Sequence, residues 1–156
     1  MMRLGIVLTG SLGLASTFAP ATLAAQDAVG VTGAAEASLP DGATFGGLSL
    51  KGLTLGQGIF IDPDGSAKGQ FQAVLQGTSP LGSPQDVVVE GEVSGGSAEG
   101  GTTTFSGTAT VSMGDGTPSL TGVPFTVTAS TGSLGLVLNG AALPTATVTA
   151  GSIAMQ

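Results

Sequence analysis

Residues 102–113 read TTTFSGTATVSM, and this stretch decides the fold. Apolar side chains such as Phe105 and Val111 recur at every second position, with Thr or Ser between them. A repeat of two residues places successive side chains on opposite faces of a β-strand, so that one face packs and the other meets water. The same rhythm returns in residues 120–130 and 145–154, which read LTGVPFTVTAS and TATVTAGSIA. These stretches predict an all-β fold.

The rest of the chain after residue 25 divides into further short strands between turn signals. Residues 77–85 and 95–101 are predicted to be loops, and Asn139-Gly140 is typical of a type I′ hairpin turn. Sequential strands with tight links usually pair as antiparallel neighbours. With short links throughout, an up-and-down barrel of about eight strands is favoured over a two-sheet sandwich. Strands are expected within residues 29–38, 48–61, 68–76, 86–94, 102–113, 120–130, 134–138 and 143–155.

Two of these strands carry finer expectations. In residues 48–61, Gly52 and Gly56 are expected to mark bends or bulges, because glycine inside a strand often does. In the last strand the alternation places Ala146, Val148 and Ala150 on one face.

Residues 1–25 are predicted to be a secretory signal peptide, with a helical apolar segment and cleavage after Ala24. Arg3 supplies the basic start, and residues 4–19 are apolar apart from Gly, Ser and Thr. That segment is too short and too rich in small residues to favour a membrane anchor. An exported protein follows, destined for the periplasm, the cell surface or the extracellular space, with residues 26–156 as a single β-domain.

The composition excludes several classes of function. Ten acids face three basic residues, and loss of Arg3 with the signal peptide would take the formal charge from −7 to −8. Such a surface repels nucleic-acid phosphates and anionic membranes. His, Cys, Trp and Tyr are all absent. Their absence closes the common catalytic triads, thiol chemistry and most zinc sites, and it disfavours a membrane barrel, which carries aromatic girdles.

One sequence motif suggests a metal site. Asp62-Pro63-Asp64-Gly65 places two carboxylates in a sharp turn, and calcium takes several oxygen ligands from such loops. The competing interpretation is an ordinary hairpin turn, since Asp, Pro and Gly are the common turn residues. Calcium at Asp62 and Asp64 is the only cofactor hypothesis that the sequence offers.

A second motif suggests carboxylate chemistry. Glu90 and Glu92 are two residues apart, so their side chains leave the same strand face about 7 Å apart. That separation falls within the range used by glycoside hydrolases. However, both glutamates alternate with Val, which predicts that they face solvent and lack the burial that tunes a catalytic acid. A hydrolase is therefore the least favoured function.

Other side-chain patterns are interpreted as structural. Ser49 with Lys51 and Ser66 with Lys68 are chance pairs near turns and bends, and the Thr-x-Thr ladders suit a solvated strand face. The pattern as a whole is typical of a small exported bacterial β-protein. We expect a non-catalytic structural or interaction module of the cell envelope or extracellular space, with a protein or matrix partner. The alternative is a small barrel that holds an apolar molecule in a cavity left by inward Gly and Ala.

Overall fold

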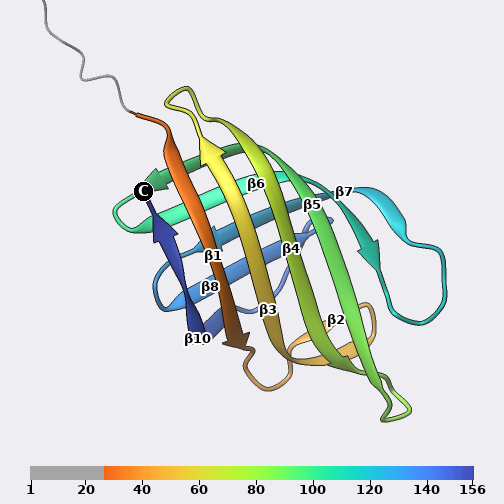
Figure 1. The fold of residues 1–156 in the computed structure, drawn as a ribbon. Helices are drawn as coiled ribbons and strands as arrows, with labels where there is room; N and C mark the ends of the chain where they lie inside the picture. Colours follow the sequence, from red (N-terminus) through yellow and green to blue (C-terminus); the bar gives the residue numbers. More distant parts are fainter. Residues whose placement is uncertain (1–26) are drawn as a thin grey trace, which may run out of the picture.

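The structure, a computed structural model, describes residues 27–156 and confirms an all-β antiparallel fold (Figure 1). The predicted signal peptide at residues 1–25 lies outside the described residues. Residues 27–156 contain no helix, and hence none that could cross a membrane. The strands are β1 (Val29–Ser38), β2 (Thr44–Phe45), β3 (Leu48–Ile61), β4 (Ser66–Thr78), β5 (Pro84–Glu99), β6 (Thr102–Ser112), β7 (Leu120–Ala129), β8 (Ser133–Leu138), β9 (Ala141–Ala142) and β10 (Ala146–Met155).

The eight long strands pair in chain order, and their hydrogen bonds run around a closed ring. Closure comes from β1, which pairs with β3 on one edge and with β10 on the other. The two-residue strand β2 pairs with β3, and the two-residue strand β9 pairs with β8, both antiparallel. The junction between β8 and β10 is short, because only Leu134 with Ala146 and Ser133 with Thr147 are paired there.

The ring has two sides, which Figure 1 shows at a steep angle to each other. β1, β3, β4 and the first part of β5 run side by side, and β6, β7 and β8 cross behind them. β5 belongs to both sides, because residues 84–95 pair with β4 and residues 88–99 pair with β6. A register shift between Val93 and Gly95 lets β5 bend from one side to the other.

The core lies inside the ring and is built around three phenylalanines. The rings of Phe71 and Phe125 stack with centroids 4.9 Å apart, and Phe105 meets both edge-on at 5.8 and 6.3 Å. Gly91 makes room for this cluster, since a Cβ atom there would lie 2.6 Å from Cε1 of Phe125. The inward alternation predicted for Phe105 and Val111 is confirmed, because both are buried.

The prediction of a loop at residues 95–101 is wrong. β5 continues to Glu99, and Gly96 pairs with Phe105 across a hairpin. The turn itself is confined to Gly100 and Gly101, whose φ angles of 57° and 80° suit a type I′ turn. Gly95 and Gly96, which the sequence suggests belong to a flexible loop, are held in the sheet by pairing with β6.

The predicted loop at residues 77–85 is also too long. Gly77 pairs with Gln85 and Thr78 with Pro84, so only residues 79–83 lie outside the strands. Pro84 is tolerated because it is the first residue of β5, where its missing N–H does least harm to the ladder.

The last strand starts later than predicted, at Ala146, and its alternation breaks at a bulge. Ala37 pairs with Val148 but Glu36 pairs with Ala150, so the intervening residue is an insertion. An inserted residue moves every following side chain to the other face. Ala150 is therefore exposed rather than inward. In β3 a register shift occurs at Gly52, as predicted, but Gly56 pairs regularly with Gln72 and forms no bulge.

Candidate functional site

A groove of about 600 Å³ crosses the outer face of the sheet from β3 to β6 and reaches Gly122 of β7. Its polar lining comes from side chains that alternate with core residues along each strand. Four buried residues that alternate with these side chains complete the lining: Gln57, Phe71, Gly91 and Ala109. The outward-facing lining residues are Gly56, Gly58, Gln70, Gln72, Glu90, Glu92, Thr108 and Thr110.

Strand register sets these residues in two parallel rows across four strands. Because neighbouring strands lie about 4.8 Å apart, each row spans about 14 Å from β3 to β6. The first row is Gly58, Gln70, Glu92 and Thr108, and the second is Gly56, Gln72, Glu90 and Thr110.

Gly56 and Gly58 form the floor of the groove on β3, and packing does not require glycine at either position. A Cβ atom at either residue would meet no atom within 4 Å, and neither backbone has the positive φ that favours glycine. Gly107 differs, since a Cβ there would lie 1.9 Å from the carbonyl oxygen of Glu92. Glycine inside a strand weakens it and often marks a place where a ligand or another backbone approaches closely. The floor is therefore bare backbone with room for a Cβ atom at both positions.

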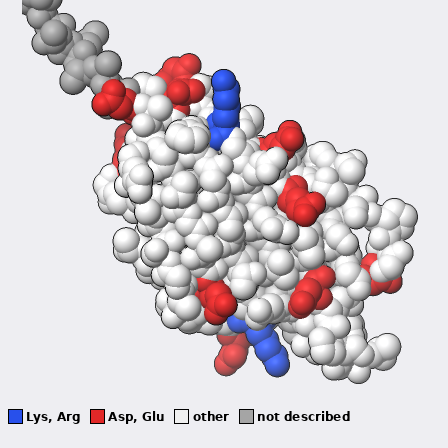
Figure 2. Space-filling model, in the orientation of Figure 1, with Lys and Arg blue, Asp and Glu red and all other residues white. Residues whose placement is uncertain are grey.

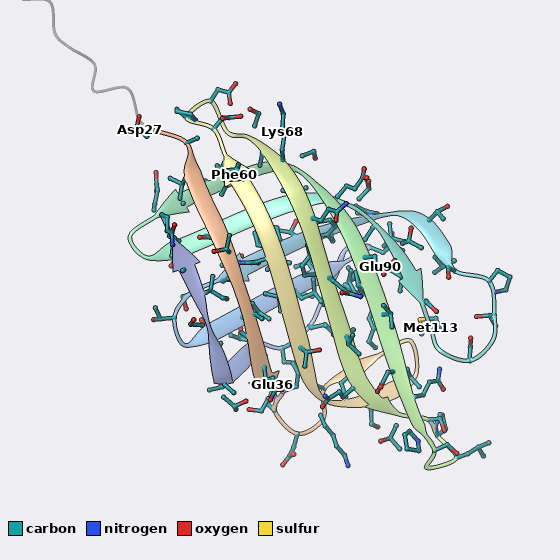
Figure 3. The ribbon with its side chains drawn as sticks, in the orientation of Figure 1. Asp27, Glu36, Phe60, Lys68, Glu90 and Met113 are labelled. Carbon is teal, nitrogen blue, oxygen red and sulfur yellow. The ribbon has the colours of Figure 1, made fainter. Side chains whose placement is uncertain are left out.

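The walls of the groove are polar and carry amide, carboxylate and hydroxyl groups. Gln72 Nε2 donates to Oε1 of Glu90 at 3.5 Å, which links the walls contributed by β4 and β5. Figure 3 shows Glu90 midway along the front of the sheet, with Phe60 and Lys68 toward one end and Glu36 toward the other. Figure 2 shows charged side chains scattered over the visible face with wide uncharged areas between them. No lysine or arginine belongs to the groove lining within residues 27–156.

The structure places both predicted glutamates in this groove. Glu90 and Glu92 are exposed on the outer face of β5 while the flanking residues Val89 and Val93 are buried, as the alternation predicts. Both residues line the groove, so their carboxylates are accessible to a ligand that binds there.

Asp62 and Asp64 lie in the turn between β3 and β4, away from the groove lining. Asp64 Oδ1 accepts hydrogen bonds from the Ser66 hydroxyl at 2.6 Å and from the Ser66 N–H at 2.9 Å. The Ser66 hydroxyl and then its N–H hold the pKa of Asp64 below its ordinary value. The same hydroxyl lies 3.3 Å from Oδ2 of Asp62, so Ser66 serves this turn rather than pairing with Lys68.

A calcium ion at Asp62 and Asp64 would need further ligands. Within residues 27–156 no three carboxylates come together in a metal-binding cluster. Two carboxylates are few for an ion that takes six to eight oxygens. Calcium binding at this turn stays a prediction.

One buried polar residue was not predicted from the sequence. Gln57 is only 9% exposed, and neither Nε2 nor Oε1 has a hydrogen-bond partner among the described residues. The sequence could have revealed the burial of Gln57, because it belongs to the series Leu55, Gln57, Ile59. Alternation along a strand places all three side chains on the inward face. Gln57 pairs with Phe71 in the neighbouring strand, so an amide lies beside the aromatic core.

Comparisons with protein-family models, with curated proteins and with solved structures found no match to this chain. The site must therefore be interpreted from its own geometry.

Proposed function

We propose that the chain is an exported, non-catalytic interaction module whose partner binds in the groove over β3–β6. The observation that carries the proposal is the bare floor at Gly56 and Gly58. Glycine costs a strand interior about 0.5–1 kcal/mol relative to alanine, and no packing or backbone constraint in the fold offsets that cost here. A partner that binds close to the backbone of β3 would explain the two glycines, because any side chain there would keep the partner away.

Binding on the outside of the ring has more support than binding inside it. The space that small inward residues would leave is occupied by aromatic rings, as the close approach of Phe125 to Gly91 illustrates. A cavity for an apolar molecule would require the cluster of Phe71, Phe105 and Phe125 to open. The groove offers its partner hydrogen-bonding groups without any such rearrangement.

We further propose that the ring is a flattened up-and-down barrel rather than a two-sheet sandwich. Strands that pair in chain order and share one interior favour a barrel. Such a barrel would hold the groove rigidly, because the floor and walls of the groove belong to four consecutive hydrogen-bonded strands of one sheet. Export is supported by the signal-peptide pattern of residues 1–25.

The test fills the groove without disturbing the core. The chain expressed from residue 1 is purified as wild type and as the double variant Gly56→Thr with Gly58→Thr. Retention of each protein on the cell-envelope and extracellular-matrix fractions of the producing cells is then measured. The proposal predicts that wild type is retained and that the double variant is not. Equal retention of the two proteins would contradict it.

A further inference from the structure

We infer that the groove binds a neutral polysaccharide chain, an inference that rests on the proposed function. The two cross-strand rows, the glycine floor and an exposed aromatic ring at one end together define the ligand. The charge, hydrogen-bonding groups, exposed aromatic ring and length of the site each match a property of a sugar polymer.

Charge selects against an ionic ligand. The lining holds Glu90 and Glu92 but no lysine, since Lys68, which pairs with Phe60, lies beyond the lining. The groove itself would therefore repel phosphates, nucleic acids and acidic glycans. A cationic partner is less favoured because neutral groups make up most of the polar lining. Glu90 also already accepts a hydrogen bond from the amide of Gln72. A neutral ligand is not repelled by the two glutamates and needs no charged partner in the lining.

The hydrogen-bonding groups match a polyhydroxylated surface. A sugar hydroxyl both donates and accepts, and ionised carboxylates only accept, while glutamine amides and threonine hydroxyls do both. In the groove each amide lies beside a carboxylate across the strand pair, Gln70 beside Glu92 and Gln72 beside Glu90. Adjacent hydroxyls of a sugar ring would therefore find a donor and an acceptor side by side.

An exposed aromatic ring supplies the apolar surface that sugar C–H groups need. Phe60 is 63% exposed and is the next outward residue after Gly58, about 7 Å along β3. A Cβ atom placed on Gly30 would lie 3.5 Å from Cε1 of Phe60, so the ring rests over bare backbone of β1. A large apolar side chain left this exposed at the end of a groove marks an interaction site when polar residues surround it.

The dimensions favour a chain over a single sugar. The rows span about 14 Å across β3 to β6, and Phe60 extends the site further along β3. The volume of about 600 Å³ lies in the range of ligand sites, but the groove is open on the solvent side. A polymer can cross such an open groove and leave at both ends.

The experiment is affinity electrophoresis of the full chain in gels that contain hydroxyethyl cellulose, laminarin, pullulan or galactomannan, followed by calorimetry with the polysaccharide that retards it. We expect at least one of these neutral polysaccharides to retard wild type. Phe60→Ala, and separately Gly56→Thr with Gly58→Thr, should each raise Kd at least tenfold. Leu81→Ala is the matched control, because Leu81 is 94% exposed at the turn between β4 and β5, and it should bind as wild type does.

Two charged polymers separate this inference from the proposed function. Retardation by polylysine alone, or by polygalacturonate alone, would overturn the polysaccharide inference and leave an interaction module in place. Absence of retardation in every neutral gel would also overturn it. Loss of envelope retention in the groove-filled variant would still support the proposed function in either case.

Discussion

Replacement of Gln57 by methionine should stabilise the protein. Its side-chain amide is buried beside the core, and neither of its polar atoms has a protein hydrogen-bond partner. A buried polar group without a partner costs about 1–3 kcal/mol, and methionine fills a similar volume without that cost. We expect the free energy of unfolding of Gln57→Met to rise by about 2 kcal/mol.

The assay is urea unfolding followed by circular dichroism. With a slope of about 2 kcal/mol per molar urea, a gain of about 2 kcal/mol moves the midpoint up by about 1 M. The same gain raises Tm by about 6–10 °C for a domain of this size. Gln76→Met is the matched control, because Gln76 is exposed on the neighbouring strand and its replacement should change stability by less than about 0.5 kcal/mol.

A fall in stability would refute the reasoning. If Gln57→Met unfolds at a lower urea concentration than wild type, the amide of Gln57 makes an interaction in solution that its described surroundings do not show. The gain must also appear without a change in slope, since a changed slope would indicate an altered unfolded or native state.

Three further predictions concern the core and the turn between β3 and β4. Gly91→Ala should lower the free energy of unfolding by about 1–3 kcal/mol by forcing the rings of Phe125 and Phe71 apart, whereas Gly56→Ala should not; urea titration compares the two. Ser66→Ala should raise the pKa of Asp64 toward its ordinary value in an NMR titration, because the Ser66 hydroxyl is the main cause of its lowering. A lowered carboxyl pKa stabilises the fold above the unfolded pKa, and this contribution disappears as pH falls through the folded value. The variant should thus lose less stability than wild type between about pH 4 and the acid limit, and an equal loss would count against the hydrogen bond. The calcium hypothesis at Asp62 and Asp64 predicts that added calcium raises Tm and that a chelator reverses the rise; an unchanged Tm would rule out the site.

The strands were predictable because their patterns are local. Alternation alone assigned Val89 and Phe105 to the core and Glu90 to the surface. The turn at Asn139-Gly140 was predictable for the same reason, and φ angles of 49° and 79° confirm it. Each of these assignments depends on residues within a few positions of one another.

Features that depend on partners distant in the sequence were not predictable. Gly96 looks like part of a flexible loop until Phe105 pairs with it. The exposure of Ala150 depends on the bulge between β1 and β10, which local alternation does not reveal.

The groove exists only because of strand register. Gly58, Gln70 and Glu92 are far apart in sequence and lie side by side because two ladders align them. Alternation predicts the glutamates as an outward pair, but it predicts only a bend or bulge at Gly56 and makes no prediction for Gly58. Their openness becomes visible only when neighbouring strands are in place.

The central claim is that Gly56 and Gly58 serve a ligand and not the fold. The most direct measurement is the free energy of unfolding of the double variant Gly56→Thr with Gly58→Thr. Since threonine suits a strand better than glycine and both Cβ positions are open, the variant should be at least as stable as wild type, with a gain of up to about 2 kcal/mol. A loss of more than about 1 kcal/mol would contradict the claim, because it would mean that the fold itself requires the two glycines.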